Sequence, residues 1–213
     1  MKKIIEQLKK IPTATISDAT EVVVGMRCHM DHDVRPLFPT KIVGEAVTVL
    51  NRKAQKPAPP IKLMKAIDEA EAGNILVVAF EDAEKSVTGW GGLLTFAAIQ
   101  QKLSGTVLNC GVRDTSEIIE KQYPIFSRSI TPSSAAGKYA VVDTQIPVSC
   151  GGVTVNPGDI IVADLDGVVV IPRADVEKVL EVSLDMEEKE AAMIEDMKQT
   201  GSIYTTFKKI LRI

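Results

Sequence analysis

The sequence has few cysteines and no spacing that would pair them. Cys28, Cys110 and Cys150 are odd in number, lie far apart and include no Cys-x-x-Cys motif. A disulfide framework needs paired cysteines, so the pattern excludes a small disulfide-stapled secreted domain. It is typical of reduced thiols and favours a cytoplasmic protein.

A long hydrophobic run is also missing at the N-terminus. The first twelve residues, MKKIIEQLKKIP, contain no apolar stretch long enough for a signal peptide or a membrane span. We therefore expect no association with a membrane. Ile4, Ile5 and Leu8 fall on one side of a helix and predict a short amphipathic helix that stops near Pro12.

Strong basic clusters and low-complexity linkers are missing as well. The net charge is −3, and the basic residues are scattered in singles and pairs such as Lys208-Lys209. This argues against nucleic-acid binding, which relies on neutralising phosphates. No low-complexity linker divides the chain. We expect one domain over residues 1–213, with residues 174–213 as a C-terminal helical extension.

What the sequence does contain is an alternation of helix-like and strand-like segments up to about residue 130. Continuous apolar runs such as ILVVAF are typical of buried parallel strands. We expect strands at 41–50, 75–80 and 106–109 and from 124. We expect helices after Pro60 as far as Gly73, at 92–103 and at 115–122. Strand–helix–strand repeats predict right-handed crossovers and a parallel sheet segment. In the 92–103 helix, Leu93 and Leu94 are expected to face inward.

Other segments complete the expected fold. Ser17 or Asp18 is a candidate cap for a short helix near residue 13. Beyond about residue 131, turn signals separate short strands at 140–148, 152–155, 159–163 and 168–171. A long helix is expected over 175–199; its charged middle is either solvated or lies across a neighbouring subunit. The fold class is therefore α/β, with a partly parallel central sheet, a β-rich C-terminal half and a long C-terminal helix.

The segment from Gly91 to Glu117 carries the most chemical information. It reads as a glycine turn, an apolar helix, a buried strand and then Arg113-Asp114 at the end of that strand. Burying two charges without partners would cost several kcal/mol per ion, so each charge needs a partner. An anionic ligand for Arg113 and a metal ion for Asp114 would supply them.

Structural explanations compete with this one. Arg113-Asp114 could instead tie a strand end to a neighbouring subunit. Gly91 and Gly92 permit a tight turn before the helix in either case. Trp90, the single tryptophan, could pack at an interface or form a substrate wall.

Other polar residues are better explained without a ligand. Asp164 and Asp166 resemble a metal pair, but a β-turn between hairpin strands accounts for them better. His29 and His32 lie in an irregular polar segment and are expected to be solvated. Cys110 could have a lowered pKa, yet a buried cysteine at a strand end is the favoured interpretation.

Several phrases of the sequence resemble the RraA-like family, which includes 4-hydroxy-4-methyl-2-oxoglutarate (HMG) and 4-carboxy-4-hydroxy-2-oxoadipate aldolases. The phrases are TATISDA, IVGEAVTV, WGGLLTFAAIQQKLSGTVLNCGVRD, PVSCGGVTVNPGD and ADLDGVVVIP, and they cover most of the chain in order. The resemblance implies a swivelling β/β/α fold. It also implies trimers or hexamers with active sites at subunit interfaces.

In the aldolase branch, the resemblance assigns roles to matching residues. Arg113 would bind the 2-oxo acid, and Asp114 would hold Mg²⁺ or Mn²⁺. The backbone N–H groups of Leu93 and Leu94, which follow Gly92 at the helix start, would cradle the substrate carboxylate. A helix N-terminus is a ready anion site, and a guanidinium matches a carboxylate bidentately.

The implied reaction is cleavage of a 4-hydroxy-2-oxo acid to pyruvate through a metal-stabilised enolate. The same enolate forms when CO₂ leaves oxaloacetate, so decarboxylation is an expected side reaction. One departure stands out: the aldolase pattern has an aspartate where this chain has Gly92. Glu117 matches the acid that the family pattern has after the Arg-Asp pair. Its implied role is to support the metal site without binding the metal itself. Asn109 and Cys110 stand where the family often has Asp and Gly.

Two other functions stay open. Some family members inhibit ribonuclease E and act as non-catalytic regulators, although that role would not require the Arg-Asp pair. A different substrate, such as a sugar acid, on the same metal–enolate platform is suggested by Gly92. The sequence alone decides neither the distal half of the substrate, nor trimer against hexamer, nor the metal.

Overall fold

A central mixed sheet organises the fold. The computed structural model describes residues 1–54, 56, 58–82 and 86–211. The strand order is β1-β7-β5-β3-β2-β12-β13, with β9 also paired to β2. The strands are β1 (Arg35–Pro36), β2 (Ile42–Lys53), β3 (Ile75–Phe80), β5 (Gly105–Leu108), β7 (Ile125–Ser127), β9 (Tyr139–Thr144), β12 (Ile160–Asp164) and β13 (Gly167–Ile171).

The middle of this sheet is parallel, as the apolar runs predict. β2 pairs with β3, β3 with β5 and β5 with β7, all in parallel. Every residue of β3 is buried, because helices cover one face and the β-rich half covers the other. The carboxyl ends of β3 and β5 therefore open toward one edge, where ligand sites of parallel sheets usually lie.

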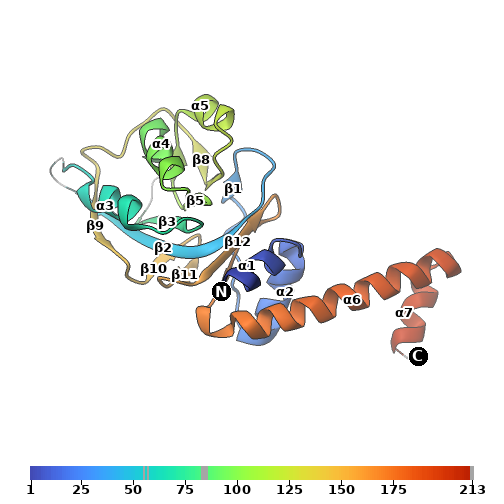
Figure 1. Cartoon of the computed structure of the whole chain (residues 1–213). Helices are drawn as coiled ribbons and strands as arrows, with labels where there is room; N and C mark the ends of the chain where they lie inside the picture. The colour runs from blue at the N-terminus through green and yellow to red at the C-terminus, as the bar shows by residue number, and fades with distance from the viewer. Residues whose placement is uncertain (55, 57, 83–85, 212–213) are drawn as a thin grey trace.

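Helices flank the sheet in two groups (Figure 1). One group, which shares a core with β2, β3 and β5, is α3 (Ile61–Glu69), α4 (Gly92–Gln100) and α5 (Thr115–Glu120). The other group, which packs on β12 and β13, is α1 (Lys2–Leu8), α2 (Thr13–Val24) and the start of α6 (Val176–Thr200). Each group buries its own apolar cluster, so the helices stabilise two separate parts of the sheet.

Short strands build two further sheets, of which the sequence predicts only one strand, at 152–155. One is a parallel sheet of β4 (Thr88–Trp90), β6 (Gly111–Val112) and β8 (Ser129–Ile130). The other is the hairpin β10 (Val148–Cys150) with β11 (Val153–Val155), whose turn is Gly151-Gly152. β4, β6 and β8, with two or three residues each, are too short to show alternation, which explains why the pattern missed them.

Three local expectations are corrected. Ser17 and Asp18 do not cap a helix; both lie inside α2, which begins directly after Pro12. Leu93 does not face inward but is 79% exposed. The helix before β3 ends at Glu69, several residues ahead of Gly73. The start, the end and the buried face of a helix all depend on packing, which the local sequence pattern does not contain.

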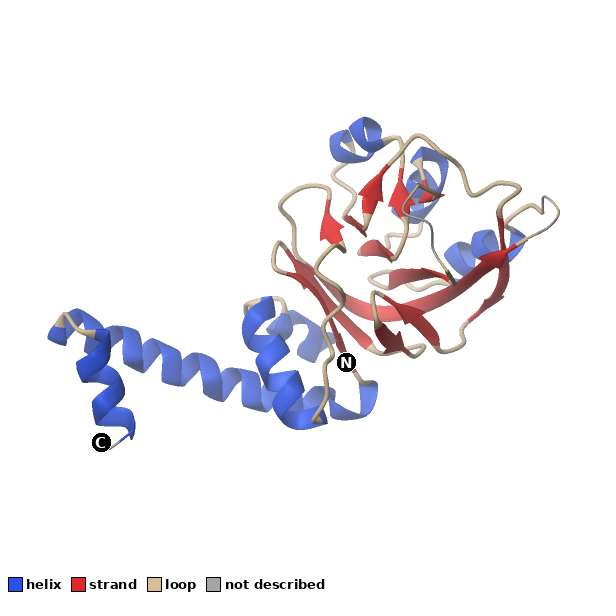
Figure 2. Cartoon of the chain, turned by 180° about the vertical axis from the view of Figure 1, so that it is seen from behind, coloured by secondary structure: helices blue, strands red, loops and turns tan. Residues whose placement is uncertain are grey.

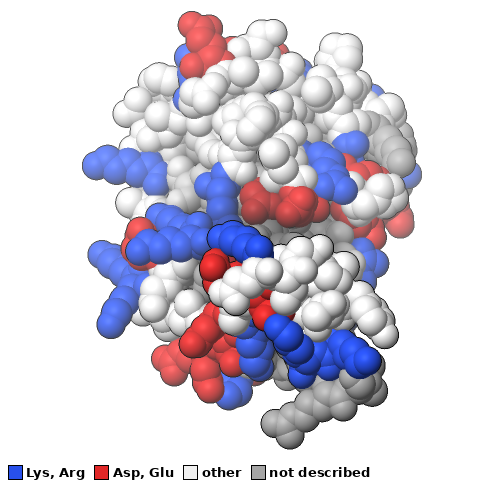
Figure 3. All heavy atoms as spheres, turned by 90° about the vertical axis from the view of Figure 1, so that its right-hand side faces the viewer, with Lys and Arg blue, Asp and Glu red and all other residues white. Residues whose placement is uncertain are grey.

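The C-terminal helices form an arm that projects from the body (Figures 1 and 2). Only the first third of α6 contributes buried residues, and α7 (Ile203–Leu211) folds back against its far end. Thr206 and Lys209 both donate hydrogen bonds to Asp196, at 2.5 and 2.6 Å. Figure 3 shows both signs of charge interspersed on this side of the molecule. In the part of the chain that is described, no helix has the length and apolar character needed to cross a bilayer.

Candidate active site

The three-stranded sheet of β4, β6 and β8 positions Arg113 and Asp114. β6 ends at Val112, and the Arg113 N–H donates to the carbonyl oxygen of Trp90 in β4 at 3.1 Å. Asp114 then adopts a left-handed conformation with φ 56° before α5 begins. A left-handed backbone is unfavourable for most residues but tolerated by aspartate, so this turn aims the carboxylate back toward α4.

The Arg113 and Asp114 side chains lie at the surface of a pocket and not in a sealed interior. Their side chains are 44% and 45% exposed, and Arg113 Nε lies 3.6 Å from Asp114 Oδ2. The same Asp114 oxygen accepts a hydrogen bond from the Gly92 N–H at 2.9 Å. An exposed ion pair contributes little to stability, so the pair does little to stabilise the single chain.

Gly91, which precedes α4, and Gly92, its first residue, lie in close contact with the side chains of Arg113, Asp114 and Glu117. A Cβ atom at Gly91 would lie 2.6 Å from Asp114 Oδ2 and 3.1 Å from Arg113 Nε. A Cβ atom at Gly92 would overlap the carboxylate oxygen of Glu117. The space that a side chain at position 92 would take is therefore filled by the Glu117 carboxylate, which reaches it from α5.

The first turn of α4 presents free backbone donors beside the pair. The Thr95 N–H donates to the Gly91 carbonyl oxygen at 3.1 Å, so the helical hydrogen bonds begin there. The N–H groups of Leu93 and Leu94 precede that bond and have no acceptor within the helix. Gly92, Leu93, Leu94, Arg113 and Asp114 thus meet at one helix N-terminus, which favours an anion.

These residues line a pocket of about 290 Å³. Its other walls come from β3, α3 and β9, with Phe80 and Tyr139 in edge-to-face contact at 5.1 Å between ring centroids. Trp90 is 2% exposed and its indole N–H donates to Thr95 Oγ1 at 2.9 Å, which fixes the turn before α4. Trp90 therefore lies mainly beneath the pocket wall, which it stabilises.

The pocket wall includes residues that the sequence does not point to. Phe80 and Tyr139 belong to it, as do Asn51, Thr88 and Ser134. The position of Phe80 at the carboxyl end of a buried strand is the one signal that could have indicated it. Tyr139 comes from β9, which joins the sheet from much later in the chain, so no local pattern reveals it.

The donor set suits a hard cation held with the help of water. Asp114 contributes a half-exposed carboxylate, of which one oxygen is bonded to Gly92, and Glu117 lies on the other side of that glycine. Among the described residues, no group of three or more His, Cys, Asp or Glu side chains is close enough to hold a metal alone. One or two carboxylates completed by waters fit Mg²⁺ or Mn²⁺, whereas structural zinc sites use four protein ligands.

The remaining polar candidates lie elsewhere and are explained by structure. Asp164 Oδ1 accepts the Asp166 N–H at 3.0 Å in the β12–β13 turn, as expected for a turn. His29 and His32 are exposed and lie outside the pocket around Arg113. Burial raises the pKa of the Cys110 thiol to about 12, so this cysteine is protonated and inert at neutral pH.

A comparison with models of known protein families identifies the family of this chain. A family model described as RraA-like, Aldolase/RraA, matches residues 13–170. The chain belongs to the RraA-like family. The match contains Arg113, Asp114, Glu117 and the first turn of α4, and it ends before the C-terminal arm.

Individual relatives agree with this assignment. The chain is 31% identical over 185 residues to Protein DlpA of Legionella pneumophila, covering 84% of this chain but only 29% of DlpA. It is 33% identical over 179 residues to a Halalkalibacterium halodurans protein named "Putative 4-hydroxy-4-methyl-2-oxoglutarate aldolase", covering 83% of this chain and 80% of that protein.

A solved structure gives the same fold. RraAS2 of Streptomyces coelicolor, described as an unusual member of the RNase ES inhibitor RraA family, superimposes with a TM-score of 0.78 at 25% identity. The match covers 89% of this chain and 94% of that one. The RraA-like architecture, with its partly parallel sheet and long C-terminal helix, is therefore confirmed.

Proposed function

We propose that this RraA-like protein is a divalent-metal-dependent lyase that cleaves a 4-hydroxy-2-oxo acid and releases pyruvate. One observation carries the proposal: a guanidinium, a half-exposed carboxylate and the free N–H groups of a helix start converge on one pocket. Relatives named as HMG aldolases support an aldolase or lyase acting on a small molecule.

The roles of the residues follow from their positions. The N–H groups of Leu93 and Leu94 would bind the substrate carboxylate, and the Arg113 guanidinium would face the 2-oxo oxygen. When the C3–C4 bond breaks, its electron pair forms an enolate on that oxygen, while the C4 hydroxyl loses its proton to water and becomes a carbonyl group. A proton taken from water at C3 then converts the enolate into pyruvate. A fixed positive charge beside the oxygen stabilises the charge that develops there.

The carboxylates complete this arrangement. Asp114 would hold the Mg²⁺ or Mn²⁺ ion, and Glu117 would orient water from the place where aldolases of the family have an aspartate. When bound, the cation supplies Lewis-acid charge that polarises the 2-oxo group. Oxaloacetate decarboxylation requires the same enolate and follows as a second activity of the same residues.

A coupled assay for pyruvate tests the proposal. HMG, 4-hydroxy-2-oxoglutarate and oxaloacetate are each supplied to protein loaded with Mg²⁺ or Mn²⁺, with and without EDTA. We expect pyruvate from at least one substrate and its loss on chelation. Activity that EDTA does not change would contradict the metal requirement.

A second candidate, a regulator that binds a ribonuclease, is favoured by the likeness to RraAS2. A well-folded protein that releases no pyruvate from any substrate, but that inhibits a purified ribonuclease E-type enzyme, would establish this function instead. Turnover of a sugar acid, with none of the 2-oxo acids accepted, would point to the altered-substrate alternative.

We further propose that the protein works as a homo-oligomer, a trimer or a hexamer. Helix α4 is apolar on nearly every side, yet Leu93 and Phe96 are exposed on its outer face beside the pocket. A helix that is apolar all round is normally buried, so a second copy of the chain is the natural cover for this face.

Replacing Phe96 by glutamate should weaken this assembly. The charge would be placed where an apolar contact is expected, at a cost of desolvation without a partner. We expect light scattering after size exclusion to give three or six times the 23.0 kDa chain mass for the parent and a smaller species for Phe96→Glu. Val22→Glu, at an exposed apolar residue of α2 in the other group of helices, is the matched control. Equal masses for all three proteins would contradict the prediction.

A further inference from the structure

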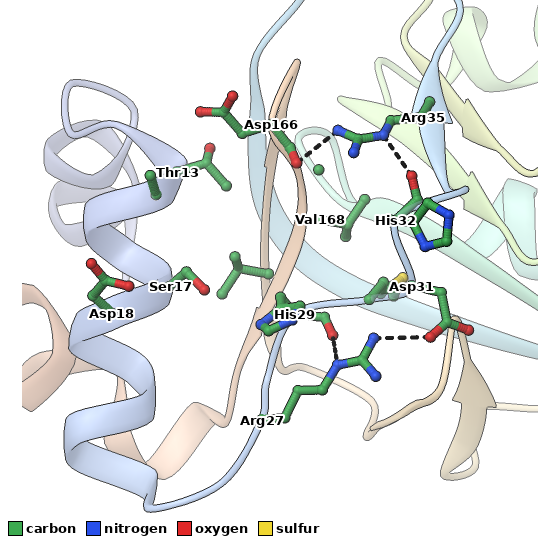
Figure 4. A pocket seen from close by; sticks show the side chains of 14 residues that line it. Thr13, Ser17, Asp18, Arg27, His29, Asp31, His32, Arg35, Asp166 and Val168 are labelled. Atoms are coloured by element: carbon green, nitrogen blue, oxygen red, sulfur yellow. Dashed lines mark hydrogen bonds and ion pairs between the residues drawn. The ribbon is translucent and has the colours of Figure 1, made fainter.

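Two hollows of this chain differ in the groups that line them. The larger, of about 560 Å³, lies beside α2 and the β12–β13 turn (Figure 4). Its two arginines are bonded within the chain: Arg27 donates to Asp31 Oδ1 at 2.9 Å, and Arg35 donates to the Asp166 carbonyl oxygen at 2.8 Å. The smaller hollow is the pocket around Arg113, where a large part of the wall has no role in the reaction proposed above.

That part of the wall is apolar. It comes from α3 with the residue before it, from the end of β3 and from β9, and its main side chains are Pro60, Leu63, Met64, Phe80, Tyr139 and Val141. Leu63, Phe80 and Tyr139 belong to the buried core, so this surface is continuous with the interior of the protein. A substrate whose carboxylate lies at the start of α4 would place its other end against these side chains.

The aromatic part of the wall is held in place. The Asn109 side-chain amide bonds to both backbone groups of Phe80: its oxygen accepts the N–H at 2.8 Å, and its nitrogen donates to the carbonyl oxygen at 3.0 Å. The Tyr139 hydroxyl donates to the Asp82 carbonyl oxygen at 2.9 Å. The one polar atom of the Tyr139 side chain is thus already bonded, so its ring offers the pocket an apolar surface.

A second carboxylate on the substrate would find little to bind here. In the part of the chain that is described, Arg113 is the one basic side chain that lines the pocket, and the proposed reaction uses it at the 2-oxo group. The Thr88 hydroxyl and the Asn51 side-chain amide already donate to backbone carbonyl groups, at 2.8 and 3.3 Å. Lys62 and Lys138 do not line the pocket and have partners of their own. A carboxylate placed against this wall would lose water without gaining a cation.

We propose that the preferred substrate is a 4-hydroxy-2-oxo acid with a single carboxylate and with an apolar group, such as methyl or ethyl, on C4. The inference rests on the lyase reaction proposed above and names its substrate class. Cleavage of the C3–C4 bond then gives pyruvate and an apolar aldehyde, while the proton of the C4 hydroxyl goes to water and a proton from water is added at C3. Phe80 and Tyr139 set the preference, because an apolar pocket discriminates by the apolar surface that it buries.

Two analogues that cannot be cleaved test the preference without turnover. 2-Oxohexanoate and 2-oxoadipate have the same chain length and differ at the far end, where one has a methyl group and the other a carboxylate. Neither has the C4 hydroxyl group that cleavage requires. In calorimetric titrations of the Mn²⁺-loaded protein, we expect 2-oxohexanoate to bind at least about tenfold more tightly. Equal affinities, tighter binding of 2-oxoadipate or no binding of either compound would overturn the inference.

Turnover separates this inference from the lyase reaction itself. 4-Hydroxy-2-oxopentanoate and 4-hydroxy-2-oxoglutarate form the corresponding pair for cleavage, and we expect kcat/KM to favour the first by at least about tenfold. A higher kcat/KM for the second, the diacid, would overturn the substrate class but support the lyase. Tighter binding of 2-oxohexanoate with no pyruvate from either substrate would reject the lyase and support a pocket selective for apolar 2-oxo acids.

A cation placed in the wall should reverse the preference. Met64 lines the pocket but is 40% exposed on α3, so the helix can accept Met64→Lys without loss of the fold. We expect the ratio of the two affinities to shift toward 2-oxoadipate by at least about tenfold, the factor that a charge-assisted hydrogen bond contributes. Ile61→Lys, at an exposed apolar residue of the same helix outside the pocket lining, is the matched control and should keep the parent ratio. A parent-like ratio in Met64→Lys would mean that the far end of the substrate does not meet this wall, which overturns the inference.

Discussion

Replacing Asp114 by asparagine is expected to abolish pyruvate release while leaving the fold intact. The amide keeps an oxygen that can accept the Gly92 N–H, which in the parent lies 2.9 Å from Asp114 Oδ2. It removes the negative charge that would hold a hard cation, and neutral amide oxygen is a weaker ligand for Mg²⁺. We expect turnover to fall by at least about a hundredfold, as for other losses of a group that stabilises developing charge.

The measurement separates loss of the metal from loss of the fold. Calorimetric titration with Mn²⁺ should show binding to the parent and none to Asp114→Asn, and the thermal midpoints should agree closely. Asp68→Asn, an exposed aspartate of α3 outside the pocket, is the matched control and should retain full activity. Parent-like turnover in Asp114→Asn would refute the assigned role.

The parallel core could be predicted because its residues carry the signal themselves. The run ILVVAF is short and rich in β-branched residues, which favours a strand buried on both faces, and the structure places it at β3 with all six residues buried. Gly92 at the start of α4 and Thr115 at the start of α5 also agree with the pattern. Where local composition and packing point to the same element, the sequence is sufficient.

The pocket could be predicted only in part, because its walls come from distant segments. The sequence indicates Arg113 and Asp114 since two adjacent charges at a strand end need partners. It does not indicate Tyr139, which reaches the pocket through the pairing of β9 with β2. The sequence also does not reveal that Leu93 is exposed, because its exposure follows from the way α4 packs. Both depend on contacts between residues far apart in the chain.

Gly92 shows how a structure changes the meaning of a sequence departure. From the sequence, glycine at this position removes an acid that aldolases of the family have. In the structure a Cβ atom there would overlap the Glu117 carboxylate, so negative charge is still present beside the Arg-Asp pair. The family pattern has an acid at the position of Glu117 as well as the aspartate at position 92, so we propose that Glu117 alone serves the site here, from the space that the missing side chain leaves.

This arrangement predicts strong coupling between positions 92 and 117. Glu117→Ala should lower turnover by about 10- to 100-fold, the usual range for groups that orient the metal ligands without binding the metal themselves. Gly92→Asp alone should also lower it, because two carboxylates would compete for one space. The overlap itself costs little, since the Glu117 side chain can swing away, and an acid in the first turn of a helix is favourable. We therefore expect activity to change more than stability.

The double variant Gly92→Asp/Glu117→Ala is the decisive measurement. It places the carboxylate on α4 and empties the space that Glu117 fills, so turnover should return to within about tenfold of the parent. In a double-mutant cycle this appears as a large coupling free energy, whereas independent sites give additive losses. Losses that simply add would mean that the Glu117 carboxylate does not serve the site, and that this protein works without an acid at that place.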